Sequence, residues 1–206
     1  MKAEGRPERV RGVFELRIHG RGGQGVVTAA ELLALAAFLE ERHAQAFPSF
    51  GSERTGAPVV AFCRIDDREI RLREPIMAPD AVIVQDPTLL HQVDVFGGMK
   101  PGGSVLVNTS RTLAELGLGD LPAGLAAGRM QVVPATELAR EHVGRPLPNA
   151  ALLGAFAAFC GVVSLESVTT AIGARFRGAV ARGNVAAAVA AHAHITREGE
   201  GRRHAA

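Results

Sequence analysis

Residues 17–41, RIHGRGGQGVVTAAELLALAAFLEE, decide the fold. The stretch begins with a short approach in which apolar and polar residues alternate, which is typical of a strand. Four glycines follow within the six positions 20–25, and an apolar run at helical spacing completes the segment. A strand, a glycine turn and a helix in this order hold phosphate in many α/β proteins. We therefore expect an α/β fold in which the glycine turn binds a nucleotide, binds another group, or only connects strand and helix closely.

Further elements alternate along the chain. Because strands and helices alternate at this spacing, they predict a parallel or mixed sheet that is covered on both faces. The fold class is thus α/β, a three-layer Rossmann-like domain with a helical C-terminal part. We expect strands at 13–19, 43–47, 59–65, 81–84, 104–108 and 130–135, a hairpin turn at 66–67 leading into 69–72, and helices at 26–41, 88–97, 149–159, 165–176 and 178–195.

The same pattern of strands and helices predicts the domain organisation. A single domain is expected over 13–196, preceded by a flexible, charged lead-in at 1–12 and followed by a flexible polar tail at 197–206. In the first helix the predicted buried face contains Val27, Ala30, Leu33, Ala34, Ala37 and Phe38. Thr28 is a candidate for bonding the free amides at the start of that helix.

Composition excludes several partners. Apolar residues make up 47% of the 206 residues and the formal net charge is only +2, so nothing requires nucleic acid or an anionic membrane. Tryptophan and tyrosine are absent, which argues against a stacking platform for single-stranded nucleic acid. The N-terminus has no apolar stretch typical of a signal peptide, and the apolar runs near the C-terminus are too short or too interrupted to span a bilayer. We expect a cytoplasmic protein with neither a nucleic-acid nor a membrane partner.

The cysteine content limits the cofactors. The chain has two cysteines, Cys63 and Cys160, both in apolar surroundings. Iron–sulfur clusters and structural zinc sites use four ligands. The chain is therefore expected to hold no cluster and no metal of its own, and both cysteines are predicted to be reduced core thiols.

The glycine turn fits the spacing G-x-G-x-x-G at Gly20, Gly22 and Gly25, with Gly23 as an additional glycine. Such a turn exposes backbone N–H groups that can bind a phosphate or a carboxylate, and Arg21 adds positive charge. A dinucleotide fingerprint also needs an acidic residue at the end of the second strand, and this position holds Phe47-Pro48. Close packing of strand against helix is the alternative explanation of the glycines.

A second polar cluster lies in FPSFGSERTGAP, residues 47–58. If the first two strands run in the same direction, this loop and the glycine turn lie at the same carboxyl edge of the sheet, where α/β proteins bind ligands. Arg54 is then the natural partner of an anion, with Glu53 as its orienting carboxylate. Ordinary solvation of a polar loop is the other interpretation.

Catalytic signatures are not found in the sequence. There is no serine nucleophile elbow, no Walker lysine and no histidine spacing typical of a metal site. We expect no catalytic residue and no metal ligand in this chain.

Three long segments carry a resemblance to a known family. GRGGQGVVTAAELLALAA (20–37), FPSFGSERTGAPVVAFCRI (47–65) and PLPNAALLGAFAAFCGVVSLESVTTAI (146–172) resemble the gamma subunit of the 2-oxoacid:ferredoxin oxidoreductases, the enzymes of the pyruvate and ketoisovalerate type. The resemblance runs from about residue 14 to about residue 191. It includes Asn149 and a weaker match around Asn184, both of which are expected to be caps at helix starts.

The resemblance implies a non-autonomous subunit. In that family other subunits hold thiamine diphosphate and 4Fe–4S clusters, and the complex performs the coenzyme A-dependent oxidative decarboxylation of a 2-oxoacid, with electrons passing to ferredoxin. The implied partners are the thiamine-binding and iron–sulfur subunits, with ferredoxin as an indirect partner, and no cofactor is held by this chain alone. The family's signature loops map to Gly20, Arg21, Gly22, Gly23, Gln24, Gly25, Ser52, Glu53, Arg54 and Thr55, and our hypothesis is that these residues contact coenzyme A or a partner subunit. The alternative is a stand-alone Rossmann-type nucleotide-binding protein.

Overall fold

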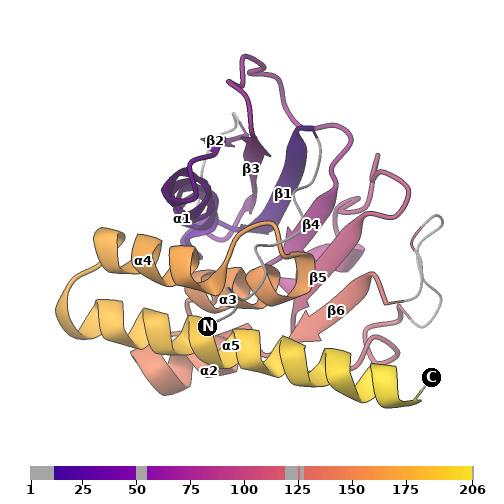
Figure 1. Ribbon diagram of the computed structural model, residues 1–206. Helices are drawn as coiled ribbons and strands as arrows, with labels where there is room; N and C mark the ends of the chain where they lie inside the picture. Colours follow the sequence, from indigo (N-terminus) through magenta and orange to yellow (C-terminus); the bar gives the residue numbers. More distant parts are fainter. Residues whose placement is uncertain (1–11, 50–54, 119–124, 126–127, 206) are drawn as a thin grey trace.

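The computed structural model describes residues 12–49, 55–118, 125 and 128–205, with side chains as far as residue 201 (Figure 1). Six strands and five α-helices are found in this part of the chain, with one short 3₁₀ helix. The strands are β1 (Phe14–Arg21), β2 (His43–Pro48), β3 (Pro58–Asp66), β4 (Ala81–Val84), β5 (Ser104–Asn108) and β6 (Met130–Val133). The helices are α1 (Val26–Leu39), η1 (Pro87–His91), α2 (Ala135–Val143), α3 (Asn149–Cys160), α4 (Leu165–Arg175) and α5 (Gly178–Ala205).

The strands form one mixed sheet in the order β2-β3-β1-β4-β5-β6. Strands β1, β4, β5 and β6 are parallel, whereas β3 is antiparallel to both β1 and β2. Consequently β2 runs in the same direction as β1, and the ends of these two strands lie at the same edge. The predicted α/β fold with a mixed sheet and a helical C-terminal part is confirmed.

The two faces of the sheet are covered differently (Figure 1). On one face, Leu16, Ile18 and Cys63 belong to a core that also contains residues of the five α-helices. On the opposite face, Val84 and Val107 belong to a second core that is closed by η1 and by the segments after β4 and β5. Both faces are covered as predicted, although the α-helices of the described residues share one side.

The helical layer packs closely where glycine permits it. Helices α3 and α5 cross at Gly154, where an added Cβ atom would lie 2.0 Å from the carbonyl oxygen of Ala188. Only a residue without a side chain allows this approach of two backbones. None of the helices in the described part of the chain is both long and apolar enough to cross a membrane.

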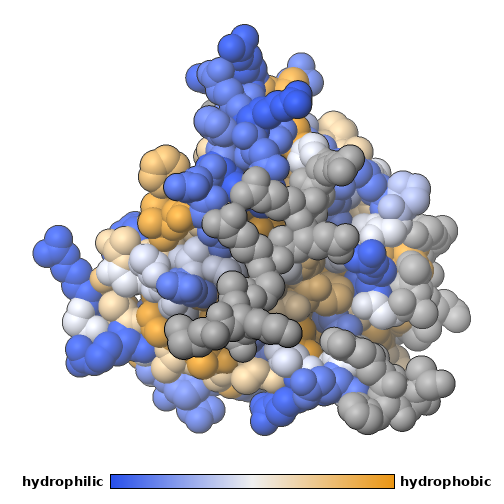
Figure 2. Space-filling view, in the orientation of Figure 1, coloured by the Kyte–Doolittle hydropathy of each residue, from blue (hydrophilic) through white to orange (hydrophobic). Residues whose placement is uncertain are grey.

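Three expectations from the sequence are wrong. Residues 69–72 form no strand; they belong to the loop between β3 and β4, which Figure 2 shows as a hydrophilic projection at the top of the molecule. The last helix, expected to end at residue 195, continues as α5 as far as Ala205. The buried face of α1 is rotated from the predicted one, so that Phe38 is 69% exposed while Leu32 and Ala36 are buried.

Candidate functional site

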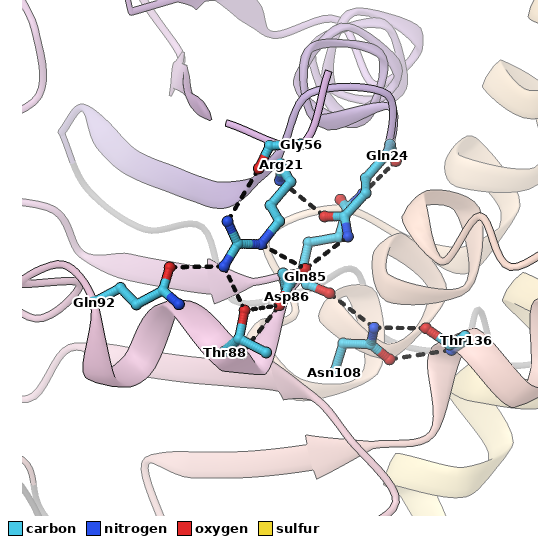
Figure 3. A network of polar contacts seen from close by, with 9 residues as sticks. All are labelled: Arg21, Gln24, Gly56, Gln85, Asp86, Thr88, Gln92, Asn108 and Thr136. Atoms are coloured by element: carbon cyan, nitrogen blue, oxygen red, sulfur yellow. Dashed lines mark hydrogen bonds and ion pairs between the residues drawn. The ribbon is translucent and has the colours of Figure 1, made fainter. Parts of the chain in front are cut away.

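Arg21, the last residue of β1, is the centre of a polar network at the carboxyl edge of the parallel strands (Figure 3). Its Nε atom lies 3.2 Å from Oδ2 of Asp86, and Nη1 donates to the carbonyl oxygen of Gly56 at 3.0 Å. Nη2 donates to Oγ1 of Thr88 at 2.6 Å and to Oε1 of Gln92 at 2.7 Å. The guanidinium group is thus committed to four acceptors of the protein.

Asp86 follows β4 and opens η1. Its Oδ2 atom accepts from Arg21 and, at 2.8 Å, from Nε2 of Gln24, while Oδ1 accepts from the backbone N–H of Thr88 at 3.0 Å. Partial burial acts to raise the pKa of this carboxyl group. The hydrogen bonds from Thr88 and Gln24 and the charge of Arg21 outweigh this effect, so the pKa is lowered overall. Asp86 is therefore a permanent anion at neutral pH.

The network extends across the sheet through side-chain amides. Oε1 of Gln24 accepts from the backbone N–H of Arg21 at 2.8 Å, and the Gln85 side chain donates to the carbonyl oxygen of Gln24. Asn108, at the end of β5, donates to the carbonyl oxygen of Gln85 and to Thr136, each at 2.8 Å. Figure 3 shows how these contacts connect the glycine turn to the start of α2.

The glycines of the turn serve two physical purposes. Gly23 and Gly25 have positive φ angles of 92° and 74°, a backbone conformation that glycine adopts at little cost. Gly20 lies within β1, and an added Cβ there would lie 2.5 Å from Cγ2 of Val26. The strand therefore packs closely against the start of α1, as the structural interpretation of the sequence expected.

Several donors of the turn remain available. The N–H groups of Gly22 and Gln24 bond within the protein, to the carbonyl oxygens of Ala57 and Arg21. Those of Gly23 and Gly25 find no partner among the described residues. The N-cap residue of α1 is Gly25, so no side chain caps this helix and the Thr28 cap is not formed. The first turn of α1 thus keeps its free amides.

Asn149 adds a further donor at the same place. It is 6% exposed, and its Nδ2 atom is directed at Gly25, where an added Cβ would lie 2.7 Å away. It is not the predicted cap, since Pro148 is the N-cap of α3 and Oδ1 of Asn149 accepts from the next residue's N–H at 3.0 Å. Asn184 is not a cap either: it lies within α5 and donates to the carbonyl oxygen of Val180.

The loop between β2 and β3 is joined to the glycine turn. Gly22 and Thr55 form a parallel bridge, the N–H of Gly56 donates to the carbonyl oxygen of Gly22 at 3.1 Å, and that of Gly22 donates to Ala57 at 2.9 Å. The shared edge predicted for the two segments is confirmed. Ser52, Glu53 and Arg54 lie outside the described residues, whereas Thr55 is exposed beside the turn.

Two more side chains of β1 lie on the same face as Arg21. Arg17 donates from Nη2 to the carbonyl oxygens of Val95 and Gly97 at 3.0 and 2.7 Å. Both ring nitrogens of the buried His19 lack a hydrogen-bond partner among the described residues. Burial, and then the charge of Arg17, lower the pKa of His19 to about 4, against the opposing effect of Asp94.

Sequence reasoning missed Asp86, Gln85 and Asn108. Their contacts join residues far apart in the chain, as in the separation of 65 positions between Arg21 and Asp86. The sequence nevertheless contains a signal that could have identified two of these residues, because Asp86 and Asn108 each follow or end a predicted parallel strand at its carboxyl end.

Metal-ligating groups do not gather in the described part of the chain: no cluster of three or more His, Cys, Asp or Glu is suited to a metal ion. Cys63 lies on β3 in the core and Cys160 ends α3. Burial raises the pKa of each thiol to about 12, so both are protonated at neutral pH.

Comparison with known proteins agrees with this geometry. The family model described as pyruvate ferredoxin/flavodoxin oxidoreductase matches residues 15–194. The chain is 51% identical over 178 residues to the pyruvate/ketoisovalerate oxidoreductases common subunit gamma of Thermococcus litoralis, covering 85% of this chain and 94% of that protein. It is 47% identical over 180 residues to the pyruvate synthase subunit PorC of Methanocaldococcus jannaschii, covering 87% and 96%.

A solved structure supports the same relationship. The crystal structure of pyruvate oxidoreductase subunit PORC from Thermotoga maritima superposes with a TM-score of 0.74 at 35% identity, covering 88% of this chain and 96% of that chain. Sequence and fold thus agree over nearly the whole length of these relatives. The chain belongs to the pyruvate ferredoxin/flavodoxin oxidoreductase family, as one of its gamma subunits.

Proposed function

We propose that this chain is the gamma subunit of a thiamine diphosphate-dependent 2-oxoacid:ferredoxin oxidoreductase of the pyruvate type. In this role it supports the coenzyme A-dependent oxidative decarboxylation of a 2-oxoacid in the cytoplasm. The names of its relatives, a common subunit gamma and a pyruvate synthase subunit, support this role.

The redox cofactors of such a complex do not fit this chain. A 4Fe–4S cluster takes four cysteine thiolates, whereas the sequence has two cysteines, on different elements and with raised pKa values. We therefore assign the clusters and thiamine diphosphate to the partner subunits, and derive no step of the reaction from this chain.

This chain contributes hydrogen-bond donors at the glycine turn and the start of α1, where an anionic group can bind. The amides of Gly23 and Gly25 have no partner among the described residues, the first turn of α1 has no side-chain cap, and Nδ2 of Asn149 lies beside Gly25. Donors at a helix N-terminus favour negative charge. We propose that they receive a phosphate of coenzyme A or a carboxylate of a partner subunit.

One observation carries this proposal: the β2–β3 loop is hydrogen-bonded to the glycine turn at Gly22. The glycine turn and Thr55, the last residue of the second signature segment, therefore adjoin one another although they are separated in the sequence. Arg21 acts as a positioning residue, because its guanidinium is bonded to the protein. The anion partner predicted from the sequence is Arg54, which lies outside the described residues.

Steady-state kinetics of the complete complex test this role. Arg54→Ala is expected to raise the KM for coenzyme A about 10-fold, the effect of one charge-assisted hydrogen bond, with the KM for the 2-oxoacid unchanged. The control is Arg68→Ala, since Arg68 is exposed on the β3–β4 loop at the opposite edge of the sheet. An unchanged KM for coenzyme A in Arg54→Ala would contradict a contact with that substrate.

The stand-alone nucleotide-binding alternative has less support. Strand β2 ends at Pro48, where a ribose-binding acid would stand. The acid at the end of β4, Asp86, is occupied by Arg21, Gln24 and Thr88. A rise in melting temperature of the isolated chain with NAD would support this alternative.

A further inference from the structure

The carboxyl edge of the sheet has a cleft in addition to the glycine turn. The cleft, of about 320 Å³, opens between η1 and the segment that follows β5. Its lining residues are Pro87, Thr88, His91, Thr109, Arg111, Glu115 and Leu116. The cleft lies outside the carboxyl ends of two adjacent parallel strands, β4 and β5, one strand away from the β1–β4 position where the strand order reverses.

The cleft has donors that the protein itself does not use. The guanidinium of Arg111 donates no hydrogen bond to the described residues, and its backbone N–H donates to Oγ1 of Thr109 at 3.0 Å. Its positive charge acts on Glu115, where it lowers the pKa of the carboxyl group together with the larger effect of the hydrogen bonds from Thr112. Thr109 is 8% exposed and accepts that bond, so its hydroxyl proton remains available toward the cleft. The imidazole of His91, which is exposed, is a further free group within this part of the structure.

The acceptors of the cleft are partly engaged, and Glu115 also places a carboxylate in the lining. Oε2 of Glu115 accepts from the backbone N–H and the hydroxyl of Thr112, both at 2.8 Å. The hydroxyl of Thr88 donates to Asp86 and accepts from Arg21. The guanidinium of Arg111 and the hydroxyl of Thr109 can bind an anion beside Glu115, and a guanidinium binds phosphate oxygens in a bidentate manner.

The apolar residues that line the cleft indicate the chemistry of the part of the ligand that is not phosphate. Pro87 and Leu116 are apolar, and the volume is at the lower limit of small-molecule sites. We propose that this cleft binds a small phosphate ester, with Arg111 and Thr109 on the phosphate and the apolar walls against its ring or hydrocarbon part. The site differs from the glycine turn, and the proposal does not depend on the function assigned above.

Calorimetric titration of the isolated full-length chain with AMP tests the proposal. Saturable binding is expected for AMP, with much weaker binding of adenosine, which lacks the phosphate. Arg111→Ala should weaken AMP binding about 10-fold or more, and Arg111→Lys should restore part of the affinity. The control Arg68→Ala should bind AMP as the unmodified chain does. Unchanged melting temperatures establish that the variants fold.

Other outcomes would overturn the proposal. These are the absence of saturable AMP binding at millimolar concentrations, equal affinity for adenosine and AMP, or tighter binding of pyruvate, which would indicate a carboxylate site. An Arg111→Ala variant with full affinity for AMP would equally contradict it.

Discussion

Arg21 and Asp86 form an ion pair at 3.2 Å that joins the end of β1 to the end of β4. The two side chains are only 22% and 14% exposed, and Gln24, Thr88 and Gln92 complete their hydrogen bonds. A pair that is shielded from water and shared among several donors is worth more than a surface ion pair. The shape of the glycine turn therefore depends on this contact.

The pair should be measurable by a double-mutant cycle. Arg21→Ala and Asp86→Ala are each expected to lower the free energy of unfolding by roughly 1–3 kcal/mol, because each leaves a partly buried polar partner unsatisfied. The double variant should lose at least ~0.5 kcal/mol less than the sum of the single losses. Urea denaturation of the isolated chain gives these values. Additive losses would show that the two side chains are not coupled.

A matched control is available on the surface. Arg71 and Glu69 also form an ion pair, at 3.1 Å, but are 84% and 68% exposed. Removing Arg71 should therefore change stability little. An effect as large as that of Arg21→Ala would contradict the importance given to shielding from water.

His19 makes stability depend on pH in the acidic range. Its pKa is about 4 in the folded chain, whereas the ordinary value of a histidine is 6.5, so the unfolded chain binds more protons between these values. Stability is therefore highest above pH 6.5 and decreases as the pH falls toward 4. The loss is at most about 3 kcal/mol, since one pKa unit corresponds to about 1.4 kcal/mol.

The measurement is chemical denaturation at several pH values with the variant His19→Leu. In the sheet His19 pairs with Val60 and Val84, so an aliphatic side chain suits the position. The variant should lose less stability than the unmodified chain between pH 7 and 4.5. The lowered pKa of Asp86 does not interfere, because the stability that this carboxylate contributes is lost only below its ordinary value of 3.8. Parallel stability curves for the two proteins would refute a role of His19.

Replacement of glycine by alanine is expected to have opposite effects at two positions, one at the α3–α5 crossing and one on α4. Gly154→Ala places a Cβ against the backbone at Ala188 and should destabilise the fold by about 3 kcal/mol or more. Gly173→Ala, in an exposed position of α4 with open space around it, should stabilise by roughly 0.5–1 kcal/mol. Thermal melting of both variants gives the sign of each change. A stable Gly154→Ala variant would show that the two helices can separate at no cost.

The extent of prediction from sequence differs between elements. Strands such as β4 and β5 were predicted with their observed bounds, because short apolar runs between turn residues have no other use in an α/β chain. The helical end of the chain was missed because residues 197–205 are polar, and polarity does not distinguish a solvated helix from an irregular tail. The rotation of α1 was missed because the helix is apolar on most sides, so its pattern does not define one face.

In the candidate site, too, some residues were predictable from the sequence and others were not. The glycine turn and its neighbour loop were found because their residues are contiguous. Asp86 and Asn108 were not, since their role comes from the sheet order, which places the ends of β1, β4 and β5 next to one another. Local patterns carry no information on such pairing.

Affinity purification of the tagged chain from its native source, under anaerobic conditions and with mass spectrometry of the co-eluting proteins, tests the central claim most directly. We predict recovery in equal amounts with a thiamine-binding subunit and a cysteine-rich iron–sulfur subunit. Recovery of the chain alone, as a monomer or homodimer stabilised by a nucleotide, would contradict the assignment as a gamma subunit of a 2-oxoacid oxidoreductase.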